Sequence, residues 1–276
     1  MINNELVMIT GAGGYLGKSI MEEFDKQNIE YVAIDLKQSS NVLKLDISKI
    51  TEADYVRLGS PTKLLHLAWR DGFIHNSEAH FEDLSSHYIF LNKMIKFGVK
   101  QLTILGTMHE LGYVEGVIDE TTTSNPTTLY GLAKDSLRKS IMIEHSCSDI
   151  TIQWIRAFYI IGDAKRGNSV FSKIYEAALS GQKKFPFTSG ENEYDFISIS
   201  ELSNQIVEVV KQKEVNGLIN CCSGNPVTLK SKVEEFIKVY ELDIELEYGA
   251  YPDRAYDSPV VYGDRTKIDK ILEGLK

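Results

Sequence analysis

The first 160 residues alternate between short apolar, β-branched runs and longer amphipathic stretches. Between the first two runs, Leu16, Ile20 and Phe24 recur every four residues, which places them on one face of a helix. The expected strands are Leu6–Thr10, Tyr31–Asp35, Val42–Asp46, Lys63–Ala68, Gln101–Gly106 and Ile150–Arg156. Two further helical stripes are Leu84, Tyr88, Leu91, Ile95 and Leu129, Leu132, Leu137, Ile141. This alternation predicts an α/β fold with a doubly wound parallel sheet covered by helices on both faces.

The alternation loosens from about residue 163. A helix over Ser169–Ser180, a strand near Leu218–Cys222 and a helix near Lys230–Tyr240 are separated by loops. We therefore expect a parallel-sheet domain over residues 1–162 and a smaller lobe over residues 163–276, partly interleaved with the first.

Composition narrows the class of protein without changing this picture. The chain has 276 residues, 43% of them hydrophobic and 25% charged, which is ordinary for a globular protein. A net charge of −9 argues against nucleic acid or anionic lipid as a partner. No apolar run approaches the roughly 18–20 residues that cross a bilayer, and the N-terminus lacks a signal peptide's features. Three cysteines suggest a reducing compartment, so we expect a cytoplasmic protein.

A glycine-rich turn follows the first expected strand and opens the first helix, with glycines at Gly11, Gly14 and Gly17. This spacing suits a turn whose backbone approaches a pyrophosphate, while the helix N-terminus supplies N–H donors. Because the strand and the amphipathic helix are both present, we interpret the segment as a dinucleotide site rather than a plain turn.

Two carboxylates end the next two strands. Asp35 lies 18 residues beyond Gly17, where a carboxylate accepts both ribose hydroxyls of an adenosine and repels a 2′-phosphate. Asp35 therefore favours NAD(H), although Lys37 lies close enough to leave NADP(H) open. Asp46 is placed to accept from an adenine amino group, or is a solvated carboxylate at a strand end.

A tyrosine and a lysine, Tyr130 and Lys134, lie four residues apart on one helical face after the fifth strand. An ammonium near a phenol stabilises the phenolate, so we expect a lowered Tyr130 pKa and proton exchange near neutral pH. Thr107 follows the same strand and its hydroxyl is placed to donate to a substrate oxygen. These three residues are the expected catalytic groups.

Together these motifs resemble the extended short-chain dehydrogenases/reductases, in particular the NAD-dependent sugar-nucleotide epimerase/dehydratase family. Further segments that carry the resemblance are His66–Trp69, Arg156–Gly162, Tyr194–Ser198, Asn220–Gly224 and Asp264–Lys267. The resemblance implies a Rossmann domain that binds NAD(P) and a C-terminal lobe that closes over a nucleoside-diphosphate sugar. Besides the residues above, it implies cofactor contacts from Tyr15, Leu16, Ile47, Leu67, Ala68, Trp69 and Phe158. It implies that Tyr130 exchanges the hydroxyl proton, Lys134 holds the nicotinamide ribose and Thr107 orients the oxygen.

Departures from the family pattern narrow the reaction. The 4,6-dehydratases place an acidic pair directly after the threonine, whereas Met108 and His109 follow Thr107 here, so dehydration is disfavoured. The segment from Gly106 to Gly112 looks more like the 4-ketoreductases of bacterial surface-polysaccharide pathways. We therefore expect an NAD(P)H-dependent reductase acting at C4 of a 4-keto-6-deoxy sugar. A 4-epimerase or a C4 oxidase with tightly bound NAD, and a non-catalytic dinucleotide-binding module, are the alternatives.

Several residues are candidates for contacts with the substrate. The resemblance points to Met108, His109 and Tyr159, and to Arg254 for the diphosphate. Lys165 and Arg166 are a second cationic candidate. Two family features are missing, because Tyr159 stands in place of an asparagine and Tyr194 in place of an arginine.

The histidines do not predict a metal site. His75, His80 and His87 are spaced five and seven residues apart, which does not place three imidazoles on one helical face. They either line the mouth of a cleft or are solvated, and His66 is interpreted as an interior residue. By analogy with the family, we also expect a homodimer formed through the Tyr130 helix and its predecessor.

Overall fold

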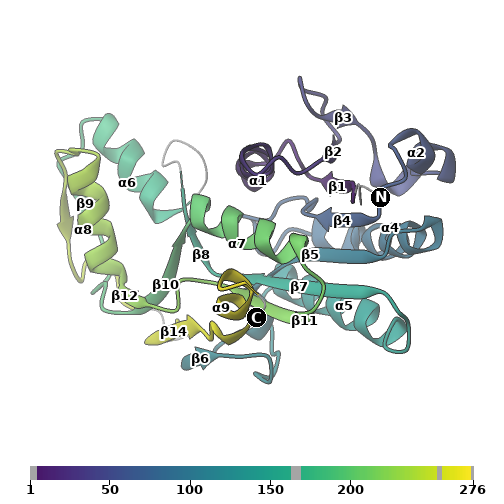
Figure 1. The fold of residues 1–276 in the computed structure, drawn as a ribbon. Coiled ribbons are helices and arrows are strands. Elements are labelled where there is room, and N and C mark those ends of the chain that lie inside the picture. Colours follow the sequence, from purple (N-terminus) through teal and green to yellow (C-terminus); the bar gives the residue numbers. More distant parts are fainter. Residues whose placement is uncertain (1–4, 163–168, 254–256, 275–276) are drawn as a thin grey trace.

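A computed structural model describes residues 5–162, 169–253 and 257–274 (Figure 1). Its main sheet has seven strands, all parallel, in the order β11-β7-β5-β4-β1-β2-β3. The strands are β1 (Val7–Thr10), β2 (Tyr31–Asp35), β3 (Leu43–Lys44), β4 (Lys63–His66), β5 (Gln101–Thr107), β7 (Thr151–Ala157) and β11 (Gly217–Cys221). All six strands expected in the first 160 residues are present, although β3 is only two residues long.

Helices cover both faces of this sheet. Successive strand residues point to opposite faces, so Met8 and Ile9 of β1 belong to different core clusters. The face of Ile9 is covered by α1 (Tyr15–Lys26), α7 (Ile199–Lys211) and α9 (Thr266–Leu272). The face of Met8 is covered by α2 (Glu52–Arg57), α4 (Leu84–Phe97) and α5 (Leu129–Glu144). The doubly wound fold is thereby confirmed.

Two elements from the second half of the chain complete the first sheet. β11 pairs with β7, with Ile219 opposite Ile155, and α7 packs against α1 (Figure 1). The sequence analysis did not identify α7, although its buried residues follow a helical period and Ser198 caps its N-terminus. The main sheet and its helices therefore draw on both halves of the chain.

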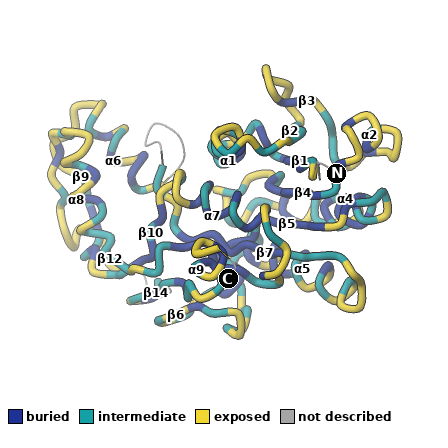
Figure 2. The backbone as a smooth tube through the Cα atoms, viewed as in Figure 1, coloured by how far each residue is buried: buried dark blue, intermediate teal, exposed yellow. Residues whose placement is uncertain are grey.

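The second lobe is built from short strands and two helices. β12 (Pro226–Thr228), β10 (Glu193–Ser198), β14 (Val260–Gly263) and β6 (Gly116–Ile118) form one sheet, with β8 (Tyr159–Ile161) beside β10. β9 (Lys184–Pro186) pairs with β13 (Glu245–Glu247). Phe171 of α6 (Val170–Leu179) and Phe236 of α8 (Leu229–Val239) pack edge to face between the two helices. In Figure 2 the buried positions concentrate in the main sheet, and a smaller group lies between α6 and α8.

A buried polar ladder joins the main sheet to the C-terminal end of α7. The Gln153 side chain, fully buried, accepts from Gln101 Nε2 (2.9 Å) and Thr103 Oγ1 (2.7 Å). Its Nε2 donates to the carbonyl oxygens of Val209, Gln212 and Val215 at 3.0–3.1 Å. These bonds fix where α7 ends against β5 and β7.

We expect Gln153→Leu to lower the free energy of unfolding by several kcal/mol, since each buried polar group left unpaired costs about 1–3 kcal/mol. Urea denaturation measures the effect. Gln182→Leu is the matched control, because Gln182 is exposed and should change stability by less than about 0.5 kcal/mol. Equal losses in the two variants would contradict the role given to the ladder.

Candidate active site

The glycine-rich turn connects β1 to α1 with close backbone contacts. Gly11 has φ +70°, and a Cβ there would lie 2.6 Å from the Ala68 nitrogen. A Cβ on Gly17 would lie 2.6 Å from the Gly11 oxygen. Only glycine fits at both positions, so the turn lies close against the two residues that follow β4, and α1 starts directly beyond it at Tyr15. The backbone cradle and the helix N-terminus suit the pyrophosphate of a dinucleotide.

The structure places Asp35 at this cradle. Its Oδ2 accepts from the Gly13 nitrogen at 3.0 Å and its Oδ1 from the Lys37 nitrogen at 3.3 Å. The carboxylate therefore lies between the glycine turn and the end of β2, where an adenosine ribose is bound in folds of this type.

Asp46 has a local structural role. It caps the short helix η1 (Ile47–Lys49) by accepting from the nitrogen and the hydroxyl of Ser48. The Ser48 hydroxyl bond holds the Asp46 pKa below its ordinary value. An adenine contact from Asp46 or Ile47 stays a prediction.

Thr107 and Tyr130 are brought together by the packing of η2 (Met108–Leu111) against the start of α5. Thr128 caps α5 by accepting from the Gly131 nitrogen at 3.1 Å. A Cβ on Gly131 would overlap the His109 carbonyl oxygen, so glycine permits the close approach. The Thr107 hydroxyl lies near enough to the Tyr130 phenol to act on its pKa, which it lowers.

Lys134 lies one turn further along α5 and is buried, with 1% of its surface exposed. Its Nζ donates to the Leu105 carbonyl oxygen at 2.6 Å and lies 4.0 Å from the centre of the Trp69 ring. Burial lowers the Lys134 pKa to about 7, and the Glu110 charge opposes this shift. The three expected catalytic residues thus gather at the ends of β4 and β5.

The expectation of a lowered Tyr130 pKa is wrong. Burial of the phenol raises its pKa, the negative charge of Glu110 adds to this effect, and the Thr107 hydroxyl opposes it. Lys134, whose Nζ is bonded to the Leu105 oxygen and lies over the Trp69 ring, does not offset this rise. The phenol therefore holds its proton at neutral pH.

Glu110 is a residue that the sequence analysis did not assign to the site. Its carboxylate is completely buried and accepts from the Thr107 nitrogen (2.9 Å) and from Trp154 Nε1 (2.8 Å). Arg156 Nε lies 3.4 Å away and Arg138 Nε 3.7 Å away. A threonine followed three residues later by glutamate is the spacing of a capping box, which was the available signal.

Gly106 leaves the space in which Glu110 sits. A Cβ there would overlap Trp154 Nε1. The carboxylate therefore lies directly below Thr107, held by groups from β5, β7 and α5.

The loop between β4 and α4 brings histidines to Tyr130. The His75 ring stacks on the phenol with centres 5.8 Å apart and planes at 12°, and His109 lies 4.5 Å from His75. Burial lowers the His109 pKa to about 4, and the His75 ring adds to the shift. His80 and His87 are buried, so their interpretation as solvated residues is wrong. His80 belongs to the loop that folds onto the start of α5, where the His75 oxygen accepts from the Tyr130 nitrogen at 2.8 Å. His87, on α4, packs against His66 and Trp69.

Interior packing explains His66. It is fully buried and bonded to Thr10 Oγ1 (2.8 Å) and His87 Nδ1 (3.0 Å), in agreement with the sequence-based interpretation. Within residues 5–162, 169–253 and 257–274, no three histidine, cysteine or acidic side chains gather as a metal site.

The other residues predicted to contact the cofactor or the substrate lie partly at the site and partly around it. Leu67 and Ala68 lie against the end of β1, with Ala68 nitrogen donating to Thr10 Oγ1 at 3.3 Å. Met108 and Phe158 are buried in an apolar cluster between η2 and the second sheet. Tyr159 lies between the rings of His109 (6.4 Å) and Tyr194 (4.6 Å). Arg254, Lys165 and Arg166 lie outside the described residues.

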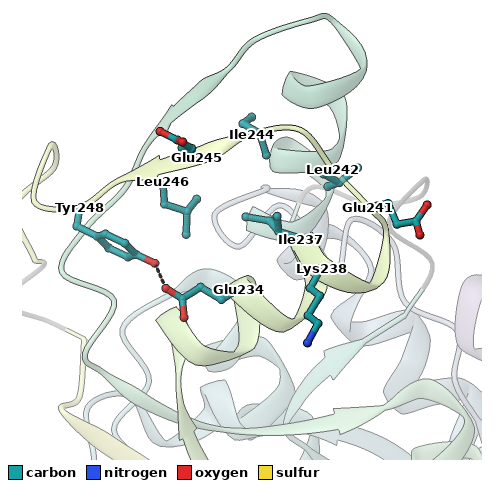
Figure 3. A pocket seen from close by; sticks show the side chains of 9 residues that line it. All are labelled: Glu234, Ile237, Lys238, Glu241, Leu242, Ile244, Glu245, Leu246 and Tyr248. Atoms are coloured by element: carbon teal, nitrogen blue, oxygen red, sulfur yellow. Dashed lines mark hydrogen bonds between the residues drawn. The ribbon is translucent and has the colours of Figure 1, made fainter.

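A separate pocket of about 480 Å³ lies between α8 and β13 (Figure 3). Its walls combine Ile237 and Leu246 with several acidic side chains, and Tyr248 donates to Glu234 across one end. None of the predicted site residues lines it.

The chain belongs to the NAD dependent epimerase/dehydratase family, whose model matches residues 7–222. It is 39% identical to a dTDP-6-deoxy-L-talose 4-dehydrogenase (NAD(+)) of Aggregatibacter actinomycetemcomitans, over 93% of this chain and 98% of that protein. These matches confirm the family predicted from the sequence. They also confirm that the protein is an oxidoreductase-type enzyme and that its cofactor is NAD(H).

Solved structures show the same fold at low sequence identity. MoeE5 in complex with UDP-glucuronic acid and NAD is 18% identical, with a TM-score of 0.81, over 97% of this chain and 92% of that chain. The UDP-glucose 4-epimerase of Thermotoga maritima is 20% identical, with a TM-score of 0.80, over 96% of this chain and 91% of that chain.

In the described part of the chain, no helix is long and apolar enough to cross a membrane.

Proposed function

We propose that this enzyme transfers hydride between NAD(H) and C4 of a nucleoside-diphosphate 6-deoxyhexose, reducing the 4-keto sugar and, in reverse, oxidising the 4-hydroxyl. The observation that carries the proposal is that the Tyr130 phenol, the Thr107 hydroxyl and the buried Lys134 gather at one end of the main sheet, where η2 packs against α5. The 39% identity to a 4-dehydrogenase of a dTDP-linked 6-deoxy sugar supports the carbon and the sugar class.

The residues of this chain handle the proton and the substrate oxygen. When bound, the nicotinamide accepts or donates hydride. Tyr130 gives its proton to the C4 oxygen during reduction and takes it back during oxidation. The Thr107 hydroxyl, already beside the phenol, holds that oxygen. The Lys134 ammonium stabilises the phenolate left after proton donation.

The raised Tyr130 pKa favours the reductive direction near neutral pH, because reduction needs the protonated phenol and oxidation needs the phenolate. His109 and Tyr159, at the side of Tyr130 that faces the second lobe, are our candidates for substrate contacts. Asp35, the glycine turn and Trp69 are the candidates for cofactor contacts.

The test mixes purified protein with NADH and a panel of nucleotide-linked 4-keto-6-deoxy sugars, and follows loss of the reduced-nicotinamide absorbance. We expect stoichiometric consumption of NADH with a C4 alcohol as product, identified by NMR. Interconversion of two C4 alcohols without net NADH consumption, together with NAD that co-purifies, would show an epimerase instead. No turnover with any sugar would leave a dinucleotide-binding module.

We expect Asp35→Asn to weaken NADH binding about tenfold, since a hydrogen bond to a charged group is worth about 1.5–3 kcal/mol. Loss of the negative charge should also narrow the preference for NADH over NADPH. Calorimetric titration with both nucleotides measures this. Asp149→Asn changes an exposed carboxylate elsewhere and should alter neither affinity.

We propose a homodimer formed through α4 and α5, which expose Ile89, Leu132 and Ile143. Sedimentation velocity should give twice the chain mass, and Ile143→Asp should shift the protein toward monomer because it places a charge in an apolar contact. A monomeric parent protein would refute the proposal.

A further inference from the structure

His80 makes two hydrogen bonds that fix its tautomer. It lies in the short helix α3 (Ala79–Glu82) with only 1% of its surface exposed. Its Nδ1 is 3.0 Å from Trp69 Nε1 and its Nε2 is 2.9 Å from the Ile74 carbonyl oxygen. An indole N–H can only donate and a carbonyl oxygen can only accept. His80 therefore accepts at Nδ1 and donates at Nε2, as a neutral imidazole.

Trp69 contacts both groups that the proposed mechanism uses to move a proton. The Lys134 ammonium lies 4.0 Å from the centre of its ring, and the Tyr130 ring packs edge-on at 6.3 Å. A cation is attracted to the face of an indole and not to its edge, so this contact depends on the orientation of the ring plane. The His87 ring stacks on Trp69 at 4.5 Å, which restricts tilting of the indole but supplies no partner for Nε1.

The Ile74 carbonyl, which accepts from His80, belongs to a loop that is also bonded to the helix that carries Tyr130. The same loop provides the His75 oxygen to the Tyr130 nitrogen (2.8 Å) and Asn76 Oδ1 to the Leu129 nitrogen (3.2 Å). His80 is therefore bonded on one side to the indole under Lys134 and on the other to the loop that holds the start of α5.

We propose that His80 is a positioning residue of the active site, which sets the plane of Trp69 and through it the Lys134 ammonium beside Tyr130. The inference rests on the proposed function. His80 itself exchanges no proton with the substrate. Without its acceptor, the partly buried indole N–H loses its partner and the ring can rotate, which displaces the charge that stabilises the phenolate.

The test is a double-mutant cycle with a rescue. His80→Phe keeps a ring but removes the acceptor, and Trp69→Phe keeps an aromatic face but removes the donor. We expect each to lower kcat about tenfold, the size expected from one lost hydrogen bond, with the substrate KM changed by less than about twofold. The double variant should be no slower than the slower single variant. His80→Asn, whose Oδ1 can replace Nδ1, should recover most of the rate.

A second readout is independent of turnover. The chain has two tryptophans, so ¹⁵N-indole labelling gives two N–H signals, and Trp69→Phe identifies the signal of Trp69. We expect the Trp69 indole proton to exchange slowly with solvent in the parent and in His80→Asn, and much faster in His80→Phe. If His80→Phe does not fold, Trp69→Phe alone still tests the donor, because His80 remains in place.

Several results would overturn the inference. Multiplicative losses in the double variant, about a hundredfold in total, would show that the two side chains act separately. Equal rates in the parent and in Trp69→Phe would show that the bond has no catalytic consequence. These outcomes differ from failure of the proposed function, in which the parent protein itself turns over no 4-keto sugar.

Discussion

Tyr130→Phe is expected to lower kcat by about a thousandfold, because a positioned general acid contributes roughly 10²–10⁴-fold to rate. The substitution removes only the phenol hydroxyl, which lies near Thr107. The ring contacts with Trp69, His75 and His80 remain, so the urea midpoint should stay close to that of the parent. Initial rates with NADH and the 4-keto sugar measure the effect.

The matched control is Tyr113→Phe. Tyr113 is exposed and, among the described residues, its hydroxyl bonds to the side chain of Glu115, so its loss should leave kcat unchanged. A Tyr130→Phe enzyme within tenfold of the parent would mean that another group supplies the proton.

The dependence of the rate on pH is a second test of the role of Tyr130. Since burial and Glu110 raise the Tyr130 pKa, reduction should lose rate only as pH rises toward that pKa, whereas oxidation should gain rate as pH rises.

Glu110→Ala is expected to reduce the free energy of unfolding by about 3–5 kcal/mol, the usual cost of removing one partner from a buried ion pair. The change leaves the buried Arg156 guanidinium without its carboxylate and the Trp154 and Thr107 N–H groups without their acceptor. Urea denaturation measures the loss. Glu22→Ala, at an exposed position of α1, should change stability by less than about 0.5 kcal/mol.

The milder Glu110→Gln separates the electrostatic role of this residue from its packing. The Glu110 charge raises the pKa of both Tyr130 and Lys134, so the neutral amide should lower both. The alkaline limb of the reduction profile should therefore move to lower pH. An unchanged profile in a folded variant would show that the carboxylate supports only the structure of the turn at Thr107.

Local patterns in the sequence predicted the first half of the fold well. The glycine turn, the strand ends and the Tyr130–Lys134 spacing each depend on residues close together in the chain, and the structure places them as expected. The extent of β3 was overestimated, because Leu43 and Lys44 are the only residues there that pair with β2.

What the sequence did not reveal depends on distant contacts. The direction of the Tyr130 pKa shift follows from burial and from Glu110, which no spacing rule reports. His80 is buried in a loop that folds onto α5, and His87 is buried by contacts with His66 and Trp69, so neither burial follows from neighbours in sequence. β11 joins β7 across 59 intervening residues, so its place in the sheet required the structure.

The pairing of β11 with β7 limits how this protein can be divided into fragments. An expressed fragment that stops at residue 162 would lack β11, so the backbone groups along one edge of β7 would be unpaired. The same strand carries the large apolar side chains of Trp154 and Ile155. Such an edge recruits other chains and aggregates. The main sheet and the second sheet therefore cannot be separated by a single cut, and a chimaera that exchanges the second sheet must keep α7 and β11 with the N-terminal half.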